Sequence, residues 1–136
     1  MKKEDCLFCK IVAGEIPSFK IFEDDQSLAF LDISGDVEGH TLVVPKEHFE
    51  SALDCPQDLF CKLMATAQKI AKHFVENCGF DGVNFAINAG KSAQQEIPHL
   101  HIHVIPRKKT DNFSIYATLA TVERDLATLQ QKLKME

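Results

Sequence analysis

The chain has 136 residues, of which 45% are hydrophobic and 26% charged, and its formal net charge at pH 7 is −5. This length is enough for one compact domain with a real core, so we expect residues 1–136 to form a single domain. The sequence has no apolar run near the roughly 18 residues that span a bilayer and no signal-like stretch after its start, which argues against a membrane protein.

The charge distribution argues against general nucleic-acid binding. A net negative charge opposes attraction to phosphate backbones unless basic residues are concentrated in a patch. The only basic cluster is residues 107–109, Arg-Lys-Lys, and we expect it to be a solvated loop. The sequence therefore predicts neither a nucleic-acid partner nor a membrane partner.

The cysteines indicate a reducing compartment. Five is an odd number, and their spacing is not that of a disulfide framework, so we expect a cytoplasmic protein. Cys55, Cys61 and Cys78 are expected to be small buried side chains on or beside a helix. Cys6 and Cys9 have the Cys-x-x-Cys spacing that lets two thiolates bind one tetrahedral zinc ion, although a buried pair of reduced thiols is the alternative.

The first half of the chain reads as strands followed by a helix. Residues 20–23 and 27–33 are apolar runs separated by a polar turn, which predicts two strands. Residues 40–44 predict a third strand, which ends at Pro45 because proline cannot donate to the strand ladder.

A long amphipathic helix is predicted in the middle of the chain. Over residues 59–75 the apolar side chains recur every three or four positions, as on one face of a helix packed on a core. Pro56 suits the first helical turn, and Gly79 suits the residue just past the end.

The second half alternates between apolar and polar residues. Residues 83–88 place Val83, Phe85 and Ile87 on one face, and residues 99–105 alternate in the same way. A final helix from about residue 119 is indicated by the spacing of Leu119, Val122, Leu126, Leu129 and Leu133. Strands joined by short turns, with helices between groups of strands, predict an α+β domain on an antiparallel sheet.

Three histidines share one face of the strand at residues 99–105. Side chains two apart in a strand point the same way, so His99, His101 and His103 lie together, and the opposite face carries Leu100, Ile102 and Val104. Three imidazoles on one face each need partners and repel one another when protonated, which favours a functional role. Imidazole can be a nucleophile, an acid or base, or a metal ligand, and the spacing leaves all three open.

Residues 99–105, His-Leu-His-Ile-His-Val-Ile, resemble the signature of the histidine triad family, His-x-His-x-His followed by two apolar residues. Residues 39–46 resemble the family's strand that carries a fourth histidine, here His40. Further matches are residues 6–32, residues 88–90 and Gln95. The resemblance covers nearly the whole chain and implies the α+β histidine triad fold.

The resemblance implies an enzyme that attacks phosphorus. His101 would attack the α-phosphorus of a nucleotide and form a nucleotidyl-histidine intermediate, which water then hydrolyses. His103 would bind the phosphate oxygens and assist the leaving group, while His40 would orient or polarise from the neighbouring strand. The implied substrates are nucleoside phosphoramidates or dinucleoside polyphosphates.

The resemblance also assigns a site for a purine nucleotide. Asp32 would hold the ribose hydroxyls, because a carboxylate accepts two hydrogen bonds well. Asn88 and Gln95 would contact phosphate or ribose, with the alternative that they are polar turn residues. The base pocket would be walled by apolar residues that could equally be ordinary core: Leu7, Phe8, Ile11, Phe30 and Ile33.

A structural zinc ion and a homodimer follow from the same resemblance. Zinc-containing members and the related galactose-1-phosphate uridylyltransferases imply that His48 and His99 complete the site begun by Cys6 and Cys9. Four protein ligands would leave no position open for water, so the zinc would be structural. Small family members pair across a two-fold axis, which implies a homodimer.

One segment departs from the family pattern and leaves the substrate open. Where relatives have Gly-Gln before the triad, this chain has Gln94-Gln95, followed by Glu96. A glutamate near a phosphate is repulsive unless it points away, which weakens assignment to the phosphoramidase branch. Two further hypotheses remain: a non-catalytic nucleotide-binding interaction protein, and a metal enzyme with the triad as ligands.

Overall fold

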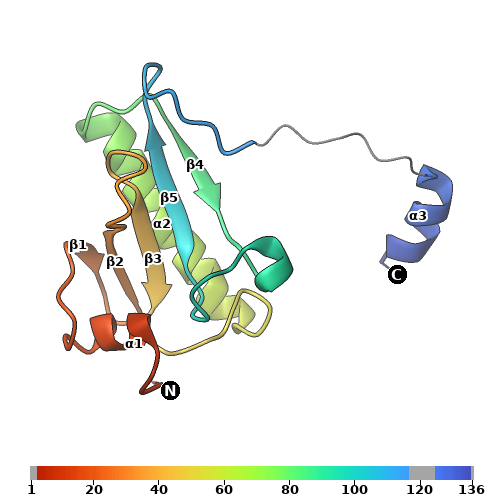
Figure 1. Cartoon of the computed structure of the whole chain (residues 1–136), viewed down its shortest axis with the longest axis horizontal. Coiled ribbons are helices and arrows are strands. Elements are labelled where there is room, and N and C mark those ends of the chain that lie inside the picture. The colour runs from red at the N-terminus through yellow and green to blue at the C-terminus, as the bar shows by residue number, and fades with distance from the viewer. Residues whose placement is uncertain (1–2, 117–124, 136) are drawn as a thin grey trace.

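The computed structural model describes residues 3–116 and 125–135. In chain order its elements are α1 (Leu7–Val12), β1 (Lys20–Glu23), β2 (Ser27–Leu31), β3 (Thr41–Pro45), α2 (Gln57–Asn77), β4 (Gly82–Ala86), a 3₁₀ turn (Lys91–Ala93), β5 (Ile102–Arg107) and α3 (Leu126–Leu133). The strands form one antiparallel sheet in the order β1-β2-β3-β5-β4. Figure 1 shows α2 lying along one face of this sheet. The predicted α+β fold on an antiparallel sheet is confirmed.

The main core lies between α2 and the sheet. The apolar stripe of α2 packs on residues of β3, β5 and the segment before β5, and the cluster comprises Ala29, Val43, Leu63, Ala67, Ile70, Ala71, Phe74, Leu100, Ile102 and Val104. Burying each large aliphatic side chain in such a cluster contributes about 1.5–3 kcal/mol. Because Leu100, Ile102 and Val104 point toward α2, the alternating histidines point to the opposite side of the sheet, as predicted.

The other face of the sheet is covered by the N-terminal segment, which the sequence pattern did not identify as helical. Cys6 caps α1, accepting at Sγ a hydrogen bond from the backbone nitrogen of Cys9 at 3.4 Å. A second core joins this segment to β2 and β3 through Cys6, Phe8, Cys9, Leu28, Phe30, Leu42 and Val44. A helix of six residues is too short to show periodicity, which is why only the folded chain reveals α1.

Several boundaries differ from the predicted ones. β2 ends at Leu31, two residues before the predicted end, and one further backbone bond, from the nitrogen of Asp32 to the carbonyl oxygen of His40 at 2.8 Å, continues its pairing beyond the strand. β5 begins at Ile102, since the preceding segment bonds elsewhere: the backbone nitrogen of Leu100 donates to the carbonyl oxygen of Phe49 at 2.7 Å. Pro45 is the last residue of β3 and pairs with Ser27, rather than lying outside the strand.

The helix at residues 59–75 is confirmed and is two residues longer at each end, because α2 runs from 57 to 77. Pro56 is its N-cap residue, and Gly79 follows the C-cap with a φ of 82°. This left-handed backbone conformation favours glycine and ends the helix.

Two surface predictions differ from the structure, the first fully and the second in part. Cys61 and Cys78 are exposed and Cys55 is half-buried. Cys61 precedes the buried Leu63 by two residues, which is about 200° around a helix and therefore outside the stripe. The basic cluster is a loop only in part: Lys108 and Lys109 follow β5, whereas Arg107 ends β5 and its Nε donates to Asp111 Oδ2 at 2.8 Å.

The C-terminal helix is confirmed in part. α3 begins at Leu126, capped by Asp125, and its leucines are exposed. Leu119 and Val122, on which the prediction also rested, lie outside the described residues. Within residues 3–116 and 125–135, no helix is long and apolar enough to cross a membrane.

Candidate active site

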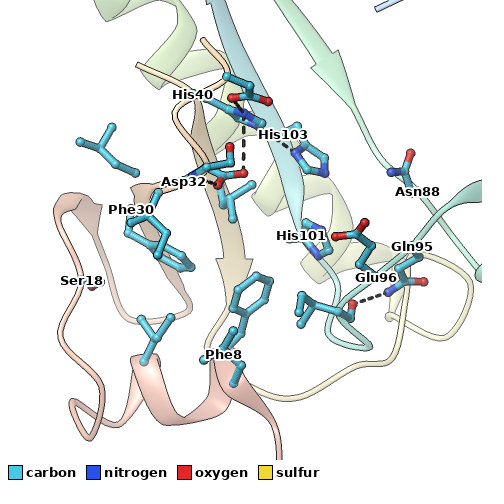
Figure 2. Close-up of a pocket in the computed structure, with 18 of the residues that line it drawn as sticks. Phe8, Ser18, Phe30, Asp32, His40, Asn88, Gln95, Glu96, His101 and His103 are labelled. Atoms are coloured by element: carbon cyan, nitrogen blue, oxygen red, sulfur yellow. Dashed lines mark hydrogen bonds and ion pairs between the residues drawn. The ribbon is translucent and has the colours of Figure 1, made fainter. Parts of the chain in front are cut away.

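A pocket of about 910 Å³ opens on the face of the sheet opposite α2, between α1, the loop after β2 and the histidine segment. Figure 2 shows its aromatic wall on one side and the histidines on the other. The predicted catalytic and nucleotide-binding residues all line it: Leu7, Phe8, Ile11, Phe30, Asp32, Ile33, His40, Asn88, Gln95, His101 and His103. The fold thus brings together residues that are far apart in the sequence.

His101 is held as a neutral imidazole with one nitrogen free. Its side chain is buried, and Nδ1 donates a hydrogen bond to the carbonyl oxygen of His99 at 2.8 Å. Burial lowers the pKa of His101, against the opposing effect of that hydrogen bond. Phe8 meets the ring edge-on at 5.2 Å between centroids. With Nδ1 carrying the hydrogen, Nε2 keeps its lone pair, as a nucleophile requires.

His103 and His40 are hydrogen-bonded to each other. The Nε2 atom of His40, on the neighbouring strand segment, lies 2.9 Å from Nδ1 of His103. Burial, followed by the nearby charges of His101 and His40, lowers the pKa of His103 to about 4. His103 is therefore a neutral ring at pH 7 whose second nitrogen is available to a ligand.

His40 has a further partner that the sequence did not reveal. Its Nδ1 donates to Oδ1 of Asp36 at 2.9 Å, while Oδ2 of Asp32 lies 3.6 Å away. Asp36 precedes His40 by four residues in an irregular loop, where spacing does not fix side-chain direction. Sequence reasoning therefore had no periodic signal by which to find it.

The nucleoside side of the pocket is apolar with one carboxylate. Phe8 and Phe30 pack edge to face with 5.5 Å between their ring centroids, and both are buried. Asp32 accepts at Oδ1 a hydrogen bond from the backbone nitrogen of Ser34 at 2.9 Å, which orients its carboxylate. Ile33, in contrast, is 87% exposed, so it lies at the rim rather than in a closed wall.

The segment before the triad is organised by Gln95. Its Oε1 accepts from the backbone nitrogen of Gly90 at 2.8 Å, and its Nε2 donates to the carbonyl oxygens of Glu50 at 2.6 Å and Ile97 at 3.0 Å. These bonds use both ends of the amide to shape the loop. Glu96 lines the same pocket as His101, and its charge acts to raise the pKa of His101 against the effect of burial (Figure 2).

Around His99, the first histidine of the triad, four possible metal ligands converge. The Sγ atoms of Cys6 and Cys9 and one nitrogen each of His48 and His99 lie within 4.8 Å of one another. Cys6 Sγ is 3.3 Å from His99 Nδ1, and Cys9 Sγ is 3.3 Å from His48 Nδ1. These separations are close to the edges of a tetrahedron with metal–ligand bonds of about 2.0–2.3 Å.

The hydrogen-bond roles of these two histidines suit a cation. His99 Nε2 donates to the carbonyl oxygen of Pro45 at 2.9 Å, and His48 Nε2 faces the Glu50 carboxylate at 3.3 Å. Since both partners are acceptors, both Nδ1 atoms carry lone pairs, and these face each other at 3.1 Å. A cation between them would relieve the repulsion, and two thiols complete a donor set that fits tetrahedral zinc.

Asp32, His40 and His103 also bring three possible ligand atoms within 4.8 Å of one another. Here, however, the ring nitrogens that face each other form a donor–acceptor pair, and the remaining nitrogen of His40 bonds to Asp36. The arrangement satisfies itself without a cation. Among the described residues, His99, His101 and His103 do not form such a group together, so the geometry does not favour a metal enzyme with the triad as ligands.

The family model of the HIT domain matches residues 13–110, which include His40 and the whole triad. The chain belongs to the histidine triad family. An uncharacterized HIT-like protein of Methanocaldococcus jannaschii is 45% identical over 106 residues, which are 78% of this chain and 81% of that protein. The crystal structure of a Streptococcus mutans protein matches with a TM-score of 0.85 and 44% identity, over 96% of this chain and 82% of that one.

Some relatives have names that state an activity. An adenosine 5′-monophosphoramidase of Candida albicans is 35% identical over 96% of this chain and 90% of its own length. An adenylylsulfatase of Arabidopsis thaliana is 38% identical over 80% of this chain and 55% of its own length. A zinc-bound histidine triad protein of Mycobacterium smegmatis has a TM-score of 0.77 and 41% identity, over 82% of this chain and 81% of that one.

Proposed function

We propose that this protein is a nucleotidyl hydrolase or transferase that acts on nucleoside phosphoramidates or dinucleoside polyphosphates through a nucleotidyl-histidine intermediate. The observation that carries the proposal is the state of His101: a buried, neutral imidazole with Nδ1 held by a backbone carbonyl and Nε2 free at the pocket. The names of the phosphoramidase and adenylylsulfatase relatives support hydrolysis at a nucleotide phosphorus.

In the proposed function, each group has a role in two displacements. His101 Nε2 attacks the α-phosphorus and the bond to the leaving group breaks; water then attacks the same phosphorus and releases His101. His103, a neighbour of His101 at 4.9 Å between ring centroids, exchanges the proton with the leaving group and then with water. Asp32 holds the ribose, and Phe8 and Phe30 pack on a purine base.

A substrate panel tests this proposal. We expect the purified protein to release the nucleoside monophosphate from at least one of adenosine phosphoramidate, adenosine 5′-phosphosulfate and diadenosine polyphosphates. Acid–base and covalent catalysis together should accelerate the reaction far beyond the uncatalysed rate. Product release is followed by chromatography. Tight nucleotide binding without turnover of any compound would instead support the interaction-protein hypothesis.

We also propose that Cys6, Cys9, His48 and His99 hold a structural zinc ion. The four donors leave no open position, and His99 begins the segment that carries His101. When bound, zinc would supply a cross-link between α1, the loop after β3 and the triad segment, rather than a reactive water. The zinc-bound Mycobacterium smegmatis relative supports this assignment.

A homodimer is the expected assembly. β4 is an edge strand of the sheet. Two large apolar side chains are exposed, Phe85 of β4 at 43% and Val75 of α2 at 42%. A second copy that pairs with this edge would satisfy free backbone groups and cover apolar surface. Sedimentation velocity at micromolar concentration should give twice the chain mass of 15.3 kDa. A single species at the monomer mass would contradict this expectation.

A further inference from the structure

Asp36 contacts His40 on the side away from the triad. Its Oδ1 accepts from Nδ1 of His40 at 2.9 Å and from the backbone nitrogen of Val37 at 2.8 Å, so the loop itself orients the carboxylate. The other carboxylate, Asp32, lies 3.6 Å from the same His40 nitrogen and has the ribose as its partner in the proposed function. Asp36 is therefore the group that holds His40 Nδ1 when a nucleotide is bound.

The Asp36 carboxylate determines which nitrogens of His40 and His103 carry hydrogens. Burial acts to raise the pKa of Asp36, but its hydrogen bond to His40 and the charge of that ring lower the pKa below its ordinary value. An ionised carboxylate only accepts, so Nδ1 of His40 must carry a hydrogen. When His40 is neutral, its Nε2 accepts from Nδ1 of His103, and Nε2 of His103 is then bare.

One added proton reverses the direction of the hydrogen bond between His40 and His103 and leaves His103 neutral. The proton enters at Nε2 of His103, and the hydrogen on Nδ1 of His103 moves to Nε2 of His40. The positive charge then rests on His40, which faces the carboxylates of Asp36 and Asp32 and, across the 2.9 Å bond, a neutral His103. His103 is buried beside His101 and is a poor place for that charge.

We propose that Asp36 is a positioning residue that acts through His40 to set which nitrogen of His103 carries a hydrogen, and that His40 takes the charge during turnover. The proposal rests on the proposed function. In the first step, the hydrogen on Nε2 of His103 goes to the leaving atom as the His101–phosphorus bond forms, and His40 returns its Nε2 hydrogen to His103. In the second step, a water proton enters at Nε2 of His103 as the His101–phosphorus bond breaks, which restores the charged His40.

The test uses the full chain and three variants. Asp36→Asn keeps the shape of the side chain but removes the obligate acceptor, and Asp36→Glu keeps a carboxylate. Glu38→Gln is the matched control, because it removes one charge from the same loop at a side chain that faces Lys108 at 3.8 Å. Thermal melting of each variant confirms that it is folded.

Nitrogen-15 NMR of the histidine rings, from mildly acidic to mildly alkaline pH, reads the hydrogens without any substrate. In the native chain we expect Nδ1–H on both His40 and His103 at alkaline pH, and the imidazolium on His40 at acidic pH. Asp36→Asn should mix the two tautomers of His103, whereas Asp36→Glu and Glu38→Gln should not. An imidazolium on His103 in the native chain, or an unchanged His103 tautomer in Asp36→Asn, would overturn the proposal.

The kinetic arm measures kcat and KM on the substrate found by the panel. Asp36→Asn should lower kcat about 10- to 100-fold with little change in KM, a part of the roughly 10²–10⁴-fold that acid–base groups contribute. Asp36→Glu should recover most of this loss. Equal kcat for native and Asp36→Asn proteins would contradict the role in turnover. If no compound is hydrolysed, the proposed function fails, while the NMR measurement still decides the role of Asp36. If Asp36→Asn does not fold, an imidazolium on His103 in the native titration would still overturn that role.

Discussion

Replacing His101 with alanine should abolish turnover while leaving nucleotide affinity within about tenfold of native, because only the nucleophile is lost. We expect kcat to fall at least about 1,000-fold, as when a covalent catalyst loses its attacking group. Phe8 loses its edge contact with the His101 ring, but Phe8 and Phe30 still pack on each other and on the second core, so the pocket walls stay in place. Steady-state kinetics and equilibrium binding of the nucleoside monophosphate measure the two quantities.

The matched control is His73→Ala, which removes an exposed histidine on α2 that bonds to Asn77. It should leave both kcat and affinity unchanged. Mass spectrometry of the native protein mixed with substrate should detect a phosphorus–nitrogen adduct. The adduct should be absent from His101→Ala. Substantial activity in His101→Ala would remove this residue from the nucleophilic role.

Removing zinc should lower the melting temperature more than any change at the pocket. The cluster joins segments 93 residues apart, Cys6 and His99, so a metal there contributes folding free energy directly. A loss of about 2–3 kcal/mol would lower the melting temperature of a chain of this size by about 5–15 °C. Differential scanning fluorimetry with and without a chelator measures this shift, and elemental analysis of protein purified without added metal should give one zinc per chain.

Variants separate structure from chemistry at this site. Cys9→Ser should imitate the chelator, Cys61→Ser should have no effect because that thiol is exposed, and His101→Ala should keep its zinc. Activity should fall only in proportion to the loss of folded protein. A zinc content far below one per chain with no thermal response to added zinc would return Cys6 and Cys9 to ordinary buried thiols. Loss of all activity on chelation with an unchanged melting temperature would revive the hypothesis of catalytic metal ligands.

Local patterns in the sequence predicted the elements that have strong periodicity. The three-and-four spacing of residues 59–75 identified α2, and the alternation of residues 99–105 placed the histidines opposite the core. The same patterns misjudged Cys61, where a cysteine on the exposed side of α2 was taken as buried. Periodicity works because side-chain direction follows from the helix and strand repeats alone.

The sequence by itself determined the family resemblance, the α+β class and a part of the pocket lining, since these depend on motifs and on local repeats. Tertiary structure alone decided which atoms meet: α1 covers the sheet, and Asp36 reaches His40. His40 and His103 are 63 residues apart, yet their nitrogens lie 2.9 Å from each other. The physical reason is that such contacts depend on the pairing of distant strands and on irregular loops, and neither leaves a periodic trace along the chain.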